Sequence, residues 1–215
     1  MSLFARLVMR DLSRSFAGGG ALLPVVFFLL VATLYPFAVG PDAALLGATG
    51  GGMLWVAALL AALLPVDRLV APDAESGVLD QLAVRGIAEE VVILAKIAAH
   101  WLAFAPALLI ATVAASALLR LDAAVLVKLE VGLAVGTPGL AALGVMVAGL
   151  TMGLRGASAL TGLLMLPLAI PILIFGAGTL APVDGGALEL LAAASLLLVA
   201  LAPFAGGAAI RAGRE

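Results

Sequence analysis

The chain has 215 residues, of which 65% are hydrophobic and 11% are charged, and its mean hydropathy is +1.28. A soluble domain usually carries about 25% charged residues, so we expect an integral membrane protein. The net charge of −2 gives no indication of nucleic-acid binding, and the lack of cysteine excludes disulfides, thiolate metal sites and cysteine nucleophiles.

Residues 2–16 precede the first apolar run and carry Arg6, Arg10 and Arg14. On a helix the large apolar side chains share one side and the arginines share the other. This pattern predicts an amphipathic helix in the headgroup plane, with its basic side toward the lipid phosphates. The alternative is an ordinary basic flank that fixes topology. The apolar run that follows is too long for a signal peptide, so we expect it to remain as an anchor.

Six apolar runs are each close to the 20 or so residues that cross a bilayer. They lie at about 21–41, 43–66, 97–119, 131–154, 156–181 and 190–210. His100 and Pro106 interrupt the third run, and a polar connection from Arg120 to Glu130 follows it. Arg155 marks the turn between the fourth and fifth runs. We therefore expect one all-α transmembrane domain over residues 1–215.

Six spans place both termini on the same side of the membrane. The Lys and Arg residues that then share that side are Arg6, Arg10, Arg14, Arg68, Arg85, Lys96, Arg155, Arg211 and Arg214. Only Arg120 and Lys128 fall on the other side. The positive-inside rule therefore predicts cytoplasmic termini and short outer loops.

Residues 67–90, here called the polar insert, separate the second and third spans and are expected in the cytoplasm. Their charged residues are Asp67, Arg68, Asp73, Glu75, Asp80, Arg85, Glu89 and Glu90. The sequence Ala71-Pro72-Asp73 resembles a helix start, with Asp73 able to cap the next turn.

Val78, Leu79 and Leu82 share one side of a short helix, while Asp80 and Gln81 point elsewhere. An anionic inner leaflet would favour basic residues here, so the acidic excess favours a protein partner. The alternative is a solvated loop.

His100 is the only histidine, and it lies beside Trp101 at the start of the third span. An ionisable group there is compatible with a ligand or proton-relay site. An interfacial anchor is the favoured interpretation, because Trp rings settle at headgroup depth.

The fourth span contains two G-x-x-x-G spacings, Gly132/Gly136 and Gly149/Gly153, which allow helices to approach closely. We expect them to pack against another span of the same chain and not to form a dimer face.

No catalytic, cofactor-binding or metal-binding residue is assigned. The chain has no G-x-x-x-x-G-K-[ST], no H-E-x-x-H and no paired carboxylates within the spans. The spans also lack the buried charges of an ion-coupled transporter. Energy for any movement must therefore come from another chain.

Several segments together resemble the CcmB family, the membrane subunit of the haem-exporter-type ABC transporter of cytochrome c maturation. They are FFLLVATLYPFAVGP (27–41), WVAALLAALL (55–64), DRLVAPDAESGVLDQL (67–82), LAKIAAHWL (94–102), VGTPGLAALG (135–144) and LPLAIPILIFG (166–176). The matches follow one another in order through nearly the whole chain.

The resemblance implies a six-span, ABC-2-like permease of the bacterial inner membrane, present in two copies. It implies a CcmA-type ATPase that binds ATP, the membrane subunits CcmC and CcmD, the haem chaperone CcmE, and haem as a possible substrate. The resemblance also implies that the polar insert is the segment that couples to the ATPase. The residues that match the family pattern there are Asp67, Arg68, Asp73, Glu75, Gly77, Leu79, Gln81 and Leu82. His100 and Trp101 also match.

Two functions follow from the resemblance. The chain is either a transport subunit driven by the ATPase, or an assembly module that remodels a haem-loaded neighbour without conducting haem. The single histidine favours the second slightly, since haem iron usually takes a strong axial ligand. An intramembrane enzyme is a third hypothesis, with His100 as its remaining candidate residue.

Overall fold

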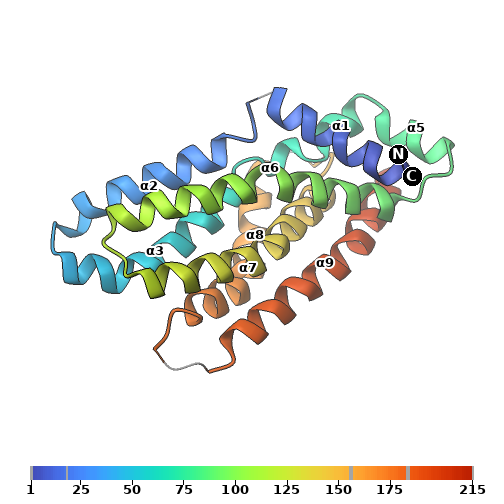
Figure 1. Cartoon of the computed structure of the whole chain (residues 1–215). Coiled ribbons are helices and arrows are strands. Elements are labelled where there is room, and N and C mark those ends of the chain that lie inside the picture. The colour runs from blue at the N-terminus through green and yellow to red at the C-terminus, as the bar shows by residue number, and fades with distance from the viewer. Residues whose placement is uncertain (1, 18, 155–156, 183–184, 215) are drawn as a thin grey trace.

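The structure is a computed structural model that describes residues 2–17, 19–154, 157–182 and 185–214. Within those ranges the regular elements are all helices, as the sequence predicts (Figure 1). They are α1 (Leu3–Ala17), α2 (Leu23–Val39), α3 (Ala43–Leu63), the 3₁₀ turn η1 (Val66–Arg68), α4 (Ala71–Glu75), α5 (Val78–Val84), α6 (Glu89–Leu118), α7 (Ala123–Leu150), α8 (Ala157–Gly178) and α9 (Ala187–Ala212).

Six of these helices are apolar, which agrees with the six predicted runs. In the described part of the chain, α3, α6, α7, α8 and α9 are long and apolar enough to cross a membrane. α2 is shorter, because its 17 residues rise about 26 Å against a hydrocarbon core of about 30 Å. The chain is therefore a multi-pass membrane protein.

Two helices begin well before the predicted spans. α6 starts at Glu89, so the last two residues of the polar insert form its first turn. α7 starts at Ala123, so the polar connection expected to reach Glu130 is confined to residues 119–122. α6 is also continuous through Pro106, where an interruption was predicted. Polar side chains can point away from the helix axis, so they do not have to end a helix. A proline is tolerated within a span where the surrounding protein satisfies the backbone groups that it frees. The predicted turn at Arg155 lies outside the described residues.

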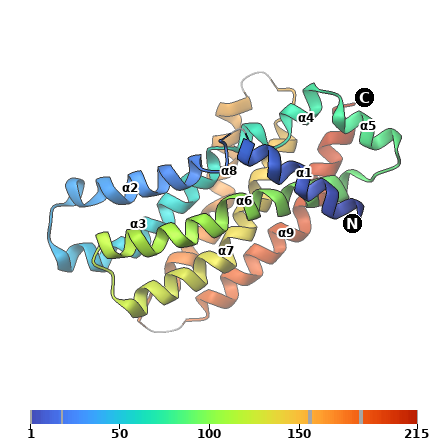
Figure 2. The same cartoon turned by 45° about the horizontal axis from the view of Figure 1, so that its top comes forward.

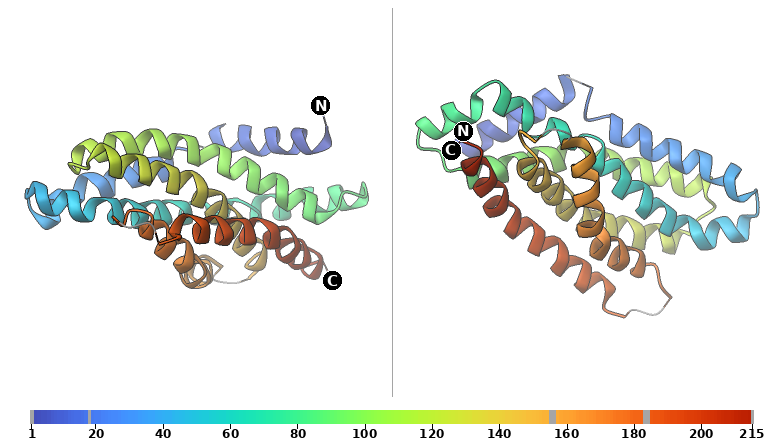
Figure 3. Two further views of the ribbon diagram at one scale, coloured as in Figure 1. Left: turned by 60° about the horizontal axis from the view of Figure 1, so that its bottom comes forward. Right: turned by 180° about the vertical axis from the view of Figure 1, so that it is seen from behind.

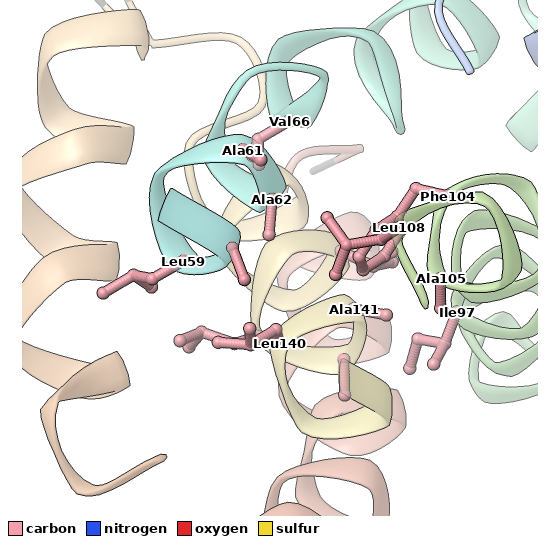
Figure 4. Packing of buried hydrophobic residues seen from close by; sticks show 14 of the residues in the cluster. Leu59, Ala61, Ala62, Val66, Ile97, Phe104, Ala105, Leu108, Leu140 and Ala141 are labelled. Atoms are coloured by element: carbon pink, nitrogen blue, oxygen red, sulfur yellow. The ribbon is translucent and has the colours of Figure 1, made fainter. Parts of the chain in front are cut away.

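α7 is the central helix of the bundle. It packs against α9, α6, α8 and α3, and Leu133, Leu140 and Leu143 on it are fully buried. Figure 4 shows Leu140 and Ala141 of α7 between side chains of α3 and α6. The apolar core therefore surrounds α7 and does not lie between two layers of helices.

Trp55 of α3 is fully buried, and its ring packs against glycines of α7. A Cβ at Gly136 would lie 2.8 Å from Trp55 Cη2, and one at Gly132 would lie 3.1 Å from Cζ2. Gly176 of α8 closes the socket, with 2.6 Å between its would-be Cβ and the indole. Gly149 instead packs against the backbone of Gly206 in α9. The prediction that these glycines serve packing within the chain is confirmed for Gly132, Gly136 and Gly149. It is wrong for Gly153, which follows the end of α7 with φ 77° and where a Cβ would meet nothing within 4 Å.

The polar elements gather at one end of the bundle. The turn between α2 and α3 lies at the opposite end from α4 and α5 (Figures 1 and 2). Both termini lie at the same end of the bundle as α5 (Figures 1 and 3). This arrangement is what an even number of crossings requires.

Candidate functional site

The polar insert folds as two short helices with glycine at their junctions. Gly77 (φ 71°) separates α4 from α5 and Gly86 (φ 72°) follows α5, in the left-handed region that suits glycine. At the second junction, Gly86 N–H donates to Ala83 O (2.8 Å) and Ile87 N–H donates to Leu82 O (3.1 Å). This Schellman arrangement ends α5 sharply and turns the chain into α6.

The inner side of α5 is fixed to the bundle. Leu79 and Leu82 are buried, at 4% and 8% exposure, and Val78 packs partly against the same core. The predicted apolar side of the insert is therefore confirmed. It faces the protein's own core.

Asp73 does not cap a helix, so that prediction is wrong. α4 begins at Ala71 after Val70, without a side-chain cap, and Asp73 lies inside the helix with 2% exposure. Its carboxylate points inward because three cations surround it. Lys96 Nζ lies 2.5 Å and Arg10 Nη2 2.6 Å from Oδ2, and Arg14 Nη1 binds Oδ1.

Asp11 extends this cluster. Its carboxylate lies 2.6 Å from Arg10 Nη2 and 3.3 Å from Lys96 Nζ. The five residues, here called the Asp73 network, are Arg10, Asp11, Arg14, Asp73 and Lys96. They join α1, α4 and α6, which are far apart in sequence.

The basic side of α1 is therefore only partly available for contact with lipid. α1 packs on α6 through Leu7 and Val8, and Arg10 and Arg14 face Asp73 where lipid phosphates were expected. Arg6 remains exposed. An interfacial position for α1 remains a prediction.

A second set of ion pairs ties the chain end to the insert. Arg214 lies 2.5 Å from Glu89 and 3.0 Å from Asp80, and it donates to Leu79 O at 2.8 Å. Arg211 lies 2.6 Å from Glu90 and 3.2 Å from Glu89. This group, here called the C-terminal clamp, consists of Asp80, Glu89, Glu90, Arg211 and Arg214. It links α5, α6 and α9.

The remaining predicted residues of the insert lie outside these contacts. Those that are exposed are Asp67, Arg68, Glu75 and Gln81, and Gly77 is half-buried. Sequence reasoning did not single out Val84, which is 89% exposed on the same outer side of α5 as Gln81. The outer face of α5, formed by Asp80, Gln81 and Val84, is thus presented on a helix that is held from behind.

His100 lies inside the protein, so the interpretation of an interfacial anchor is wrong for it. It is 5% exposed, and its ring centroid lies 4.8 Å from that of Phe104. Its Nε2 is buried without a hydrogen-bond partner among the described residues. Trp101 is half-buried and donates from Nε1 to Thr137 Oγ1 of α7 at 3.1 Å. α6 thus places the two side chains on different sides.

The described residues contain no group of three His, Asp or Glu side chains that could hold a metal ion. The site instead consists of a polar end in which ion pairs join the insert to α1, α6 and α9. Such an arrangement can transmit force applied to α5 into the long helices, because the contacts on its inner side are both apolar and charged.

Comparison with known proteins identifies the family. A family profile described as "CcmB protein" matches residues 2–213. The chain belongs to the CcmB family. The resemblance inferred from separate segments is therefore confirmed over nearly the whole length.

Curated CcmB relatives carry the name "Heme exporter protein B". The protein of Rhodobacter capsulatus is 45% identical over 211 residues, covering 95% of this chain and 97% of that protein. The protein of Bradyrhizobium diazoefficiens is 41% identical, covering 100% of both chains. The protein of Escherichia coli K12 is 37% identical, covering 87% of this chain and 88% of that protein. These relatives are aligned over most of their length.

Proposed function

We propose that this CcmB-family chain is the permease subunit of an ABC transporter for haem export or haem-chaperone release in cytochrome c biogenesis. Its relatives are named heme exporter protein B, and its sequence contains no P-loop. In this proposal a CcmA-type ATPase binds and hydrolyses ATP, and this chain has no enzymatic activity of its own. Haem is the substrate and not a resident cofactor.

The observation that carries the proposal is the outer face of α5. Val84 is 89% exposed and Gln81 is exposed, while Leu79 and Leu82 anchor the other side of the same helix in the core. The exposed Val84 lies on a helix whose other side is anchored in the core, and this combination supports docking of a protein partner on the outer face. The docking surface proposed for the ATPase is this face together with Glu75.

Coupling follows from the contacts behind that face. When the ATPase dimer closes on ATP, it pushes α5. Arg214 carries the displacement to α9, and Glu89 carries it to α6, because both belong to the C-terminal clamp. Two copies of the chain act together, with CcmC, CcmD and the chaperone CcmE as further partners. The assembly lies in the bacterial inner membrane, with both termini in the cytoplasm.

A matched pair of substitutions tests the docking surface. Val84→Asp places a charge on the outer face of α5, and Val127→Asp makes the same change at the opposite end of the bundle, where Val127 is 62% exposed. We expect Val84→Asp to lose co-purification with the ATPase and stimulated ATP hydrolysis, while Val127→Asp keeps both. Normal values for both variants would contradict the proposal.

A second candidate function is a non-conducting assembly module that remodels a haem-loaded partner. It is favoured by the only histidine, whose Nε2 is buried, and by the lack of a metal-binding cluster among the described residues. Haem iron usually takes a strong axial ligand, for which a single histidine is a sparse supply.

Vesicles reconstituted with this chain and the ATPase distinguish the two functions. ATP-dependent movement of haem across the membrane supports transport by the permease. Release of haem chaperone by ATP without any such movement supports the assembly module. His100→Ala provides a further arm, since retained haem movement would exclude His100 as an obligatory ligand.

A further inference from the structure

A cavity of about 240 Å³ opens between α1, the start of α2, the segment from η1 to α4, and α6. Its wall on α6 is a single stripe formed by Lys96, Ala99, His100, Ala103 and Phe104. The spacing of three and four residues places these side chains on one side of the helix. Over these two turns, about 12 Å, the wall changes from a cation to an aromatic ring.

The end of the cavity near Lys96 has an excess of positive charge. The charged residues that line the cavity are three cations, Arg14, Arg68 and Lys96, and two carboxylates, Asp11 and Asp73, which leaves one positive charge. Within the described ranges no ion pair joins Arg68 to a carboxylate. Arg14 remains half-exposed although it pairs with Asp73. This end is therefore suited to an anion.

The other end of the cavity is apolar. Ala21, Pro24, Ala103 and Phe104 line it. His100 lies between the two ends, with Nε2 buried and unpaired in the described structure. A buried polar atom without a partner is unfavourable unless a ligand supplies one. The cavity thus has its cations at one end and its apolar wall at the other, which is the order in which an amphiphile presents its headgroup and its tail.

The size of the cavity limits what it can enclose. Sites that enclose drug-sized ligands measure about 300–1,000 Å³, so this cavity is small for a porphyrin. A phosphate headgroup with its first methylenes fits, while the remaining tail extends into the bilayer. We propose that the cavity binds the phosphate of an anionic phospholipid between Arg14, Arg68 and Lys96, with the acyl chain against Ala103 and Phe104. This binding requires neither the ATPase nor haem.

The test titrates the full-length protein in detergent with phosphatidylglycerol and with phosphatidylcholine, and counts bound lipids by native mass spectrometry. Inorganic phosphate and haem are added separately as competitors. Arg68→Ala removes one cation from the cavity. Its matched control is Arg85→Ala, because Arg85 is exposed in the same insert but does not line the cavity. Ala103→Phe fills the apolar end.

We expect tighter binding of phosphatidylglycerol than of phosphatidylcholine. Arg68→Ala should weaken phosphatidylglycerol about fivefold, the effect of one cation near an anionic headgroup, while Arg85→Ala leaves it unchanged. Ala103→Phe should abolish lipid binding. If that variant fails to fold, the comparison of the two arginine variants decides the question.

Three results would overturn the proposal. Equal binding of phosphatidylglycerol to the Arg68→Ala and Arg85→Ala variants would show that the cavity is not the lipid site. Displacement of the lipid by inorganic phosphate, with phosphate binding unchanged in Ala103→Phe, would assign the site to a free anion. Displacement by haem that depends on Arg68 would assign it to the cargo.

Discussion

Lys96 Nζ of α6 lies 2.5 Å from Asp73 Oδ2 of α4, and both side chains are almost completely buried, at 6% and 2% exposure. Two buried charges lose hydration on folding, and their attraction offsets that loss only while both are present. Removal of one partner therefore destabilises a protein far more than the net contribution of the pair suggests. The position of α4 against α6 depends on this contact.

Asp73→Ala should lower the free energy of unfolding by about 3 kcal/mol, because it leaves Lys96 buried with only Asp11 at 3.3 Å. The midpoint of thermal unfolding in detergent measures this effect. Glu75→Ala is the matched control, since Glu75 is an exposed carboxylate in the same helix and its substitution should change stability by less than about 0.5 kcal/mol. Equal midpoints for the two variants would show that the buried pair has no structural role.

A double variant separates the pair from the individual residues. Asp73→Ala combined with Lys96→Met removes both buried charges, so it should be less destabilised than the sum of the single variants by about 0.5–3 kcal/mol. Arg10 and Arg14 tolerate the loss of Asp73 better, because they keep partial access to water. Strict additivity of the two changes would contradict a direct interaction.

The Asp73 network also shows what the sequence could not predict. Lys96 is followed by His100 in an apolar run, and no carboxylate lies three or four residues away on α6. Its partner is Asp73, and the other cations around that carboxylate come from α1. Patterns within one helix therefore gave no signal for the network. They gave a plausible but wrong role for Asp73 as a cap, because the residues around it do resemble a helix start.

Arg214→Ala should loosen α5 without unfolding the protein. Its pairs with Asp80 and Glu89 are partly exposed and together contribute up to about 1 kcal/mol. Amide hydrogen exchange in residues 78–84 should therefore become faster by up to about fivefold. Arg6→Ala is the control, since Arg6 is exposed on α1 and should leave this exchange unchanged. Unaltered exchange in Arg214→Ala would show that α9 does not hold α5.

Gly136→Ala should destabilise the bundle by about 1–3 kcal/mol, because the new Cβ would lie 2.8 Å from Trp55 Cη2 in a closely packed interior. Gly162→Ala has open space within 4 Å and serves as the control, which should unfold at or above the wild-type midpoint. Trp55→Phe should partly restore the stability of the Gly136→Ala variant, because the smaller ring leaves space for the new Cβ. A Gly136→Ala variant as stable as Gly162→Ala would mean that the socket adapts at no cost.

The spans were predictable because lipid imposes a simple requirement, which is a long apolar segment with satisfied backbone groups. The G-x-x-x-G spacing of Gly132 and Gly136 correctly indicated close packing, although only the fold shows that Trp55 packs against them. Helix ends were less predictable. Glu89 begins α6 before the apolar run, and it pairs there with Arg211 of α9 and with Arg214, which follows α9.

Crosslinking tests the contact between the outer face of α5 and the ATPase most directly. Because the chain has no cysteine, Val84→Cys and Val127→Cys variants each carry a single thiol. Membranes that contain the assembled transporter would be treated with a short thiol-to-amine crosslinker, with and without ATP. We predict an ATPase adduct from Val84→Cys whose yield changes with ATP, and none from Val127→Cys. An adduct from Val127→Cys together with none from Val84→Cys would contradict the proposed docking of the ATPase on α5.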